Sequence, residues 1–180
     1  GRIYALDALT GEEQWVSLVS SAVLGSVLVQ DGQVYVTTFD GALIALDARN
    51  GEMLWQKKVA DRIWAAPFLY DGLIFFGDAN GNLYAFDLDG EEQWSQELNG
   101  AVIASPLVKD ETLVAVTSLG NIYLMGLDGS DIQPVSIGGE LYASPAPAGD
   151  FILVAVTDGD NFLIALDQNG AQKWVYTPEK

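Results

Sequence analysis

Cysteine and histidine are both absent from the 180 residues of this sequence. The lack of cysteine excludes disulfides and thiol nucleophiles, and the lack of histidine excludes every catalytic triad that uses an imidazole base. Zinc sites built from cysteine and histidine are excluded for the same reason. The commonest nucleophilic and zinc-dependent active sites are therefore not available to this chain.

Basic residues and long apolar runs are scarce as well. Eight lysines and arginines stand against 25 aspartates and glutamates, which gives a formal net charge of −17. Such a charge argues against nucleic acid or an anionic membrane surface as the partner, and it favours basic partners or cations. No apolar run reaches the roughly 18–20 residues that a membrane helix needs, so we expect no direct insertion into a membrane.

What is present is the composition of a folded protein, with 49% hydrophobic and 18% charged residues. The chain begins with Gly1 rather than methionine, and it starts directly in the middle of a repeating pattern. We expect it to be a piece of a larger protein from which any targeting segment is missing.

The stretch GRIYALDALTGEEQW opens the chain and returns four times, as GALIALDARNGEMLW, GNLYAFDLDGEEQW, GNIYLMGLDGSDIQ and NFLIALDQNGAQKW. The last positions of the five copies are 40, 39, 39 and 41 residues apart and are occupied by Trp15, Trp55, Trp94, Gln133 and Trp174. A second, staggered pattern keeps the same period and includes GSVLVQDGQVYV and APFLYDGLIFFG. Two markers in one register indicate an internal repeat.

Each period consists of short runs rich in valine, isoleucine, phenylalanine and tyrosine, such as QVYVTT and LIFFGD, separated by Asp-Gly and Asn-Gly pairs. Such runs favour β-strands, and asparagine, aspartate and glycine accept the backbone angles of tight hairpins. Four antiparallel strands in every period of about 40 residues are typical of a β-propeller blade, which buries the same face against each next blade. We therefore predict an all-β propeller of four-stranded antiparallel blades.

The repeat divides residues 1–180, a single propeller segment, into about four and a half blades. The predicted units are a half blade at 1–19 and full blades at 20–59, 60–98, 99–138 and 139–177. The half blade finds no inner strands elsewhere in the chain. Either the chain is part of a larger ring, or two copies pair through their open edges as a homodimer, because unpaired strand edges invite pairing.

The repeat resembles the PQQ-type β-propeller repeat of quinoprotein alcohol dehydrogenases and of non-enzymatic relatives such as the outer-membrane assembly lipoprotein BamB. The family's pattern, Ala-x-Asp-x-x-(Thr)-Gly-x-x-x-Trp, is complete at residues 5–15. In the fourth copy Leu124, Gly126 and Gln133 replace its alanine, aspartate and tryptophan. The resemblance implies a ring of seven or eight blades, in which tryptophans dock on the neighbouring blade and glycines occupy the outer turns. The docking residues so implied are Trp15, Trp55, Trp94, Trp174, Gly11, Gly51, Gly90, Gly129 and Gly170.

The residue types of the pattern fit these roles on physical grounds alone. Alanine leaves room for an aromatic ring, and aspartate accepts backbone N–H groups in a turn. Tryptophan supplies a large, rigid apolar face. The five tryptophan and glutamine positions are therefore interpreted as packing between blades.

A quinone site is the main enzymatic alternative. By resemblance it would need calcium held by carboxylate and amide oxygens, a catalytic aspartate, a tryptophan stacked on PQQ and usually a vicinal disulfide. The disulfide is impossible without cysteine, and most acidic residues fall in turns or at repeat positions, so no carboxylate is singled out as a general base. We predict no catalytic residue and no cofactor, with PQQ and calcium belonging only to the alternative.

Two acidic turns are the candidates for a metal site. In GDANGNL, Asp78 and the asparagines after it begin like a calcium loop, but Asp89 and Gly90 stand where its glutamate is needed, so a hairpin turn is favoured. In TDGDN, Asp158 and Asp160 are the better candidates, with an ordinary acidic turn as the favoured interpretation.

A candidate contact surface comes from Trp64, which stands before the first strand of its period, in DRIWAAP. Tyr142 holds the matching place two periods on, and in a propeller this segment approaches the central channel or its rim. Arg62 is one of three arginines in the chain. We predict that Arg62, Trp64 and Tyr142 form a contact surface, with packing near the hub as the alternative.

These observations favour a non-catalytic scaffold that binds a protein or another ligand of the cell envelope. The resemblance implies a location outside the cytoplasm: periplasmic, on the cell surface or secreted. Two alternatives stay open, a fragment of a PQQ-dependent alcohol or sugar dehydrogenase and the sensor domain of a membrane receptor or kinase.

Overall fold

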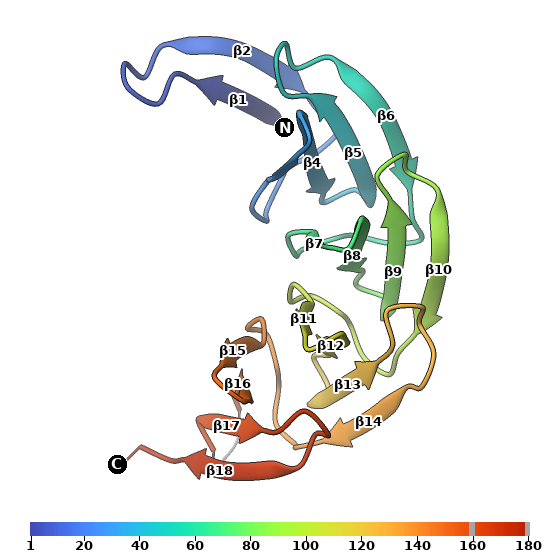
Figure 1. The fold of residues 1–180 in the computed structure, drawn as a ribbon, viewed down its shortest axis with the longest axis vertical. Helices are drawn as coiled ribbons and strands as arrows, with labels where there is room; N and C mark the ends of the chain where they lie inside the picture. Colours follow the sequence, from blue (N-terminus) through green and yellow to red (C-terminus); the bar gives the residue numbers. More distant parts are fainter. Residues whose placement is uncertain (159–160, 179–180) are drawn as a thin grey trace.

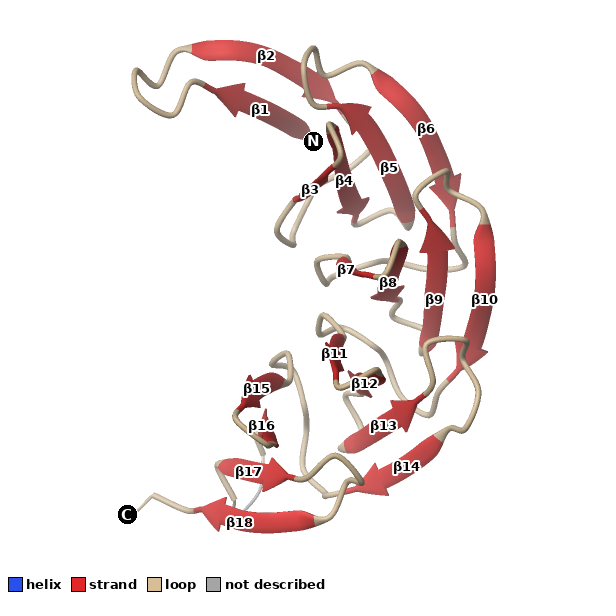
Figure 2. Cartoon of the chain, in the orientation of Figure 1, coloured by secondary structure: helices blue, strands red, loops and turns tan. Residues whose placement is uncertain are grey.

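The computed structural model describes residues 1–158 and 161–178, which form 18 β-strands and contain no helix. The strands are grouped in sheets that follow one another along an open arc (Figure 1). Only loops and turns connect them (Figure 2). The predicted all-β fold of propeller blades is confirmed, and the described residues offer no helix that could cross a membrane.

The five sheets are numbered here as blades 1 to 5. Blade 1 has two strands, β1 (Arg2–Leu6) and β2 (Glu13–Leu18). Blade 2 contains β3 (Leu28–Gln30), β4 (Gln33–Thr38), β5 (Ala42–Asp47) and β6 (Met53–Lys58). Blade 3 contains β7 (Phe68–Tyr70), β8 (Leu73–Gly77), β9 (Asn82–Asp87) and β10 (Glu92–Glu97). Blade 4 contains β11 (Leu107–Lys109), β12 (Thr112–Val116), β13 (Asn121–Met125) and β14 (Gln133–Ser136). Blade 5 contains β15 (Ala146–Ala148), β16 (Phe151–Ala155), β17 (Leu163–Leu166) and β18 (Gln172–Tyr176).

Within each full blade the strands are antiparallel and hydrogen-bonded in chain order. The first strand of each full blade faces the concave side of the arc and the fourth lies on the convex side (Figure 1). Asp31 and Gly32 join the first two strands of blade 2, with φ of 49° and 77°. Asp71 and Gly72 do the same in blade 3, with φ of 48° and 76°. Two consecutive left-handed residues make a type I′ turn, whose twist matches that of the strands beside it.

The hydrophobic core lies between the blades. Tyr35, Leu43 and Ala45 of blade 2 pack against Ile74 and Phe76 of blade 3, and none of the five is more than 1% exposed. The same kind of contact joins blades 1 and 2, 3 and 4, and 4 and 5. Because successive side chains of a strand point to opposite faces, each of blades 2, 3 and 4 buries one face against each neighbour.

One tryptophan on the outermost strand links each of the first three blades to the next. The Trp15 indole nitrogen donates a 2.9 Å hydrogen bond to the Ala48 carbonyl. In the same way Trp55 donates to the Leu88 carbonyl at 3.2 Å, and Trp94 donates to the Leu127 carbonyl at 2.8 Å. The indole rings cover three buried glycines with φ of 74°, 80° and 77°, which are Gly51, Gly90 and Gly129. A Cβ on these glycines would lie only 2.6 to 2.9 Å from the rings, so each position requires glycine both for its φ and for the space.

The alanine of the repeat lies opposite the tryptophan across the outer hairpin, in the pairs Ala5–Trp15, Ala45–Trp55, Ala85–Trp94 and Ala165–Trp174. Beside each pair the strand register shifts, as in a β-bulge. In blade 4 Leu124 faces Gln133 and the two strands pair without a shift. The small alanine, the bulge and the tryptophan therefore occur together.

Candidate functional site

The segment that precedes β7 holds Trp64 at the surface. Ile63 and Ala65 on either side are 1% and 5% exposed, whereas Trp64 is 45% exposed. The Thr37 hydroxyl of blade 2 donates a 2.7 Å hydrogen bond to the Ala65 carbonyl, which ties the segment to the neighbouring blade. These buried neighbours anchor the backbone on both sides of the exposed indole.

Phe39 and Arg62 complete a cluster around this indole. Phe39, in the β4–β5 turn of blade 2, meets the Trp64 ring edge to face, with ring centroids 5.1 Å apart and an interplanar angle of 89°. The Arg62 guanidinium carbon lies 5.9 Å from the Phe39 centroid, and Arg62 Nε lies 3.3 Å from Asp61 Oδ1. The Phe39–Trp64 geometry is favourable for an aromatic pair, and the Arg62–Phe39 distance is favourable for a cation–π contact. We call Phe39, Arg62 and Trp64 the rim cluster.

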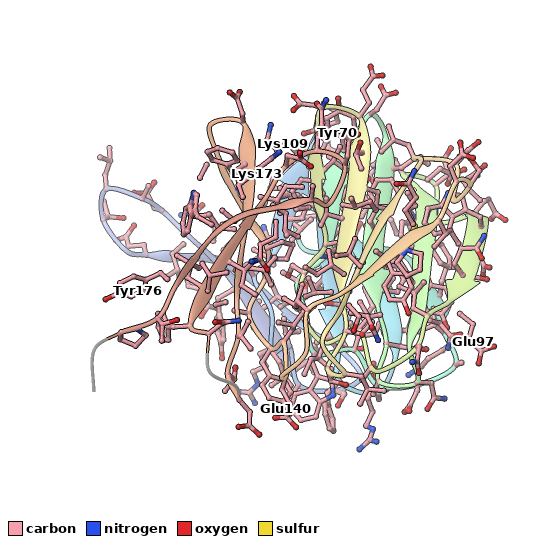
Figure 3. All side chains as sticks on the ribbon, turned by 90° about the horizontal axis from the view of Figure 1, so that it is seen from below. Tyr70, Glu97, Lys109, Glu140, Lys173 and Tyr176 are labelled. Atoms are coloured by element: carbon pink, nitrogen blue, oxygen red, sulfur yellow. The ribbon has the colours of Figure 1, made fainter. Side chains whose placement is uncertain are left out.

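Tyr142, the third residue of the predicted surface, lies on the matching segment of blade 5, and the whole of blade 4 stands between it and Trp64. Its side chain is 46% exposed, and its hydroxyl donates a 2.9 Å hydrogen bond to Glu140. This hydrogen bond, with burial and the nearby carboxylates, raises the pKa of Tyr142. Glu140 lies at the opposite rim from Tyr70 and Lys109 (Figure 3).

The structure thus joins two of the three predicted residues through a residue that the sequence reasoning missed. Phe39 stands where the matching turns have Ala79 and Ser118. An aromatic residue at a repeat position that otherwise holds small residues is the signal that could have identified it.

Asp78, the first of the acidic turn residues, lies at 0% exposure inside the β8–β9 turn. Its carboxylate accepts hydrogen bonds from the Tyr84 hydroxyl at 2.8 Å, from the Asn82 side chain at 2.9 Å and from two backbone N–H groups. Burial, followed by the hydrogen bond to Asp78, raises the pKa of Tyr84. Asp78 therefore stabilises the turn and has its oxygens occupied by internal donors.

The second metal candidate falls partly outside the described residues, because Asp160 is not among them. Asp158 is exposed. Within residues 1–158 and 161–178, no three acidic side chains are grouped as a metal ion would require.

The architecture matches a known family. The family model for the outer membrane protein assembly factor BamB, PQQ_2, matches residues 1–65 and 61–135, which is most of the chain. The chain belongs to this family. No curated protein sequence matches it.

Solved structures of the same fold include a member of this family. The crystal structure of BamB from Moraxella catarrhalis aligns with 98% of the chain at a TM-score of 0.86 and 23% identity. The chain spans only 58% of that protein. Quinohemoprotein alcohol dehydrogenase ADHIIG from Pseudomonas putida HK5 aligns with 91% of the chain at a TM-score of 0.78 and 17% identity, over 35% of its own length. The computationally designed Ika4 protein aligns over 99% of its length and 93% of the chain, at a TM-score of 0.69 and 16% identity.

Proposed function

We propose that this chain is a non-catalytic scaffold that binds a protein partner outside the cytoplasm, in the assembly of outer-membrane proteins. The family's description as an outer membrane protein assembly factor supports the process and the location. The single observation that carries the contact is the rim cluster, where an exposed indole is held by buried neighbours beside an arginine.

The rim cluster has the chemistry of a binding hot spot. Tryptophan and arginine are the residue types that most often dominate interface energies, and a contact held rigid before binding loses little conformational entropy. Arg62 is one of only eight basic residues in a chain with a net charge of −17. A partner that meets Trp64 with an apolar side chain and Arg62 with a carboxylate or backbone carbonyl fits this cluster.

The test measures binding of the purified chain to each purified outer-membrane assembly protein of the same organism, immobilised in turn. Trp64→Ala should weaken binding by about thirtyfold or more, as expected for a hot-spot tryptophan. Tyr70→Ala, which removes an exposed aromatic ring from the opposite rim, should leave binding unchanged. Equal binding by Trp64→Ala and the unmodified chain would show that the partner docks elsewhere.

A third variant tests whether the predicted surface extends to blade 5. If the partner spans the rim, Tyr142→Ala weakens binding as well, because Tyr142 occupies the matching segment. If it does not, the contact is limited to the rim cluster. The thermal unfolding of each variant, measured in parallel, separates a lost contact from a lost fold.

The absence of cofactor chemistry is part of the proposal and is tested directly. The likeness to ADHIIG, at 17% identity, concerns the fold. Addition of PQQ and calcium at micromolar concentration should give no quinone absorbance that stays with the protein through gel filtration. A protein-bound quinone spectrum with dye-linked alcohol oxidation would favour the dehydrogenase alternative.

A further inference from the structure

An open groove lies between blades 3 and 4, two complete four-stranded sheets in the middle of the arc. Its volume is about 390 Å³. The groove is lined by Leu73, Gln93, Trp94, Leu127 and Asp128. Leu73 pairs with Tyr70 in the β7–β8 hairpin, so the groove lies towards the rim that holds Tyr70, opposite the rim of Glu140 (Figure 3).

The groove walls are mostly apolar and are held in place. Leu73, Trp94 and Leu127 are partly buried and pack against the hydrophobic core between the two blades. The Trp94 indole nitrogen donates a 2.8 Å hydrogen bond to the Leu127 carbonyl, and Gln93 Nε2 donates one of 2.8 Å to Asp87. A site whose walls are fixed before binding loses little conformational entropy when a ligand enters.

The corresponding place between blades 2 and 3 is polar. Gln33 holds the repeat position of Leu73, and Tyr35 holds that of Phe75. The Tyr35 hydroxyl lies 3.1 Å from Gln33 Oε1 and 3.4 Å from the Leu88 carbonyl oxygen, and it can donate to either. Leu73 and Phe75 have no polar side-chain atom, so no such hydrogen bond forms in blade 3. The apolar groove therefore comes from these two residues and not from the repeat.

One charged group lines the groove, the Asp128 carboxylate. Its Oδ1 accepts hydrogen bonds from the Ser130 hydroxyl at 2.6 Å and from the Ser130 backbone N–H at 3.0 Å. These hydrogen bonds lower the pKa of Asp128, so the group is charged at neutral pH. Asp128 forms no ion pair with any residue in the described part of the chain. A cation that reaches the groove therefore meets a carboxylate that is still unpaired.

We propose that the groove binds an aromatic side chain that is followed directly by arginine or lysine in a segment of a partner protein. The aromatic ring packs against Leu73, Trp94 and Leu127, where a ring gains more from the indole than its buried area alone supplies. The cationic side chain pairs with Asp128 at the edge of the groove, and the net charge of −17 favours its approach. This inference does not depend on the rim cluster or on the proposed function.

Nuclear magnetic resonance of the ¹⁵N-labelled chain tests the site directly, because the Trp94 indole N–H reports from its wall. The probe is the acetylated and amidated peptide Gly-Ser-Phe-Arg-Ser-Gly, added up to millimolar concentration in about 0.15 M salt, which screens long-range attraction. We expect a saturable shift of the Trp94 indole resonance. No shift would overturn the proposal. A shift that follows protein concentration without peptide would assign the groove to a second copy and would overturn it as well.

Two control peptides separate the ring from the cation. Replacing the phenylalanine of the probe by serine should weaken binding by about tenfold or more, since the apolar contact is lost. Replacing its arginine by serine should weaken binding by about threefold, because the ion pair is exposed. Equal binding of all three peptides would show non-specific association and contradict the proposal.

Two variants of the chain test the two halves of the groove. Leu73→Gln introduces the residue that blade 2 has at this position, and it should weaken binding of the probe by about tenfold or more. Asp128→Asn changes an exposed side chain and should bind the arginine and serine forms of the peptide equally. If both variants bind the probe as the unmodified chain does, the ligand occupies another site.

Leu119→Gln is the matched control for Leu73→Gln. Leu119 is 60% exposed in the β12–β13 turn of blade 4 and is not among the residues that line the groove. This variant should bind the probe like the unmodified chain. Circular dichroism of every variant confirms that the blades remain folded.

Discussion

Trp94 makes three kinds of contact at once. Its ring covers Gly129 of blade 4, its nitrogen donates to the Leu127 carbonyl at 2.8 Å, and its centroid lies 5.9 Å from that of Phe75 in its own blade. Glycine is needed beneath the ring because any Cβ there would lie 2.8 Å from a ring carbon. At the residue scale, one large side chain therefore holds two blades together through packing and a hydrogen bond.

Trp94→Ala should lower the free energy of unfolding by about 3–5 kcal/mol, because it leaves a cavity and an unpaired carbonyl. Chemical denaturation followed by circular dichroism measures the change. Gln133→Ala is the matched control, because Gln133 holds the same repeat position but is exposed, and it should change stability by no more than about 0.5 kcal/mol. A loss below about 1 kcal/mol for Trp94→Ala would mean that the indole contributes little to the interface.

Asp40 gives a pH-dependent prediction at the same scale. Partial burial raises its pKa, but hydrogen bonds from Lys58, Thr38 and Ser20 outweigh burial and lower the pKa to about 2. Because this pKa lies below the unfolded value of about 3.9, the carboxylate stabilises the fold fully above about pH 4 and loses that effect as the pH falls towards 2.

Asp40→Asn should therefore be less stable than the unmodified chain near neutral pH, by about 1 kcal/mol or less for so exposed a site. Unfolding measured at a series of pH values should show this difference shrink between about pH 4 and about pH 2. Glu12→Gln, in an exposed turn, is the control and should change stability by at most about 0.5 kcal/mol. A difference that stays constant down to pH 2 would mean that the hydrogen bonds to Asp40 do not stabilise its charge.

At the scale of elements, blade 4 shows how a contact between blades is made without tryptophan. Gly170 of blade 5 meets Val135 and Leu124, which fill part of the place that an indole holds in the other copies. Beside them lies an open hollow of about 250 Å³, with Gln133, Gln168 and other residues of both blades in its wall. In the β13–β14 hairpin, Leu124 and the exposed Gln133 therefore occupy the positions that alanine and tryptophan hold in the other blades.

The double variant Leu124→Ala with Gln133→Trp should restore the contact and raise the free energy of unfolding by about 1–2 kcal/mol. Gln133→Trp alone should raise the free energy of unfolding by less than the double variant does, or should lower it, because Leu124 occupies the space opposite the new ring. Leu124→Ala alone should destabilise by about 2–5 kcal/mol. Denaturant unfolding of all three variants gives the coupling between the two positions, and simple additivity would contradict this account.

At the scale of the whole molecule, the acidic charge acts against compactness. A net charge of −17 is distributed over a chain with only eight basic residues, so most carboxylates have no cation beside them. Each ion pair among the described residues has at least one exposed side chain, as in Lys57 with Glu91 at 2.9 Å, and pairs of this kind contribute little.

The thermal unfolding midpoint should therefore rise with salt. As the ionic strength goes from about 0.01 M to about 0.15 M, the screening length falls from about 30 Å to about 8 Å and the repulsion weakens. Calorimetry at several salt concentrations measures the shift, with a variant that replaces exposed glutamates by glutamine as the control. That variant should respond less to salt, and an equal response would assign the effect to something other than charge.

Part of the candidate site could be predicted from the sequence and part could not. The sequence alone indicates Trp64, because this tryptophan stands outside the repeat positions. Its partner Phe39 lies 25 residues earlier in another blade, so only the packing of blade 2 on blade 3 joins them. Tyr142 matches Trp64 in the repeat, but a full blade separates the two.

The sequence alone determined the type of fold, because a period of about 40 residues with alternating strands and Asp-Gly turns leaves few ways to bury one face per repeat. The repeat also indicated which residues pack between blades, since four of the five copies present the same tryptophan and all five present the same glycine. Only the tertiary structure decided which side chains fill these positions. Gly51 and Gly170 have nearly the same φ, 74° and 77°, yet Gly51 lies beneath an indole ring and Gly170 meets Val135 and Leu124. The difference comes from the neighbouring blade, and a blade's neighbour is a property of the arrangement in space.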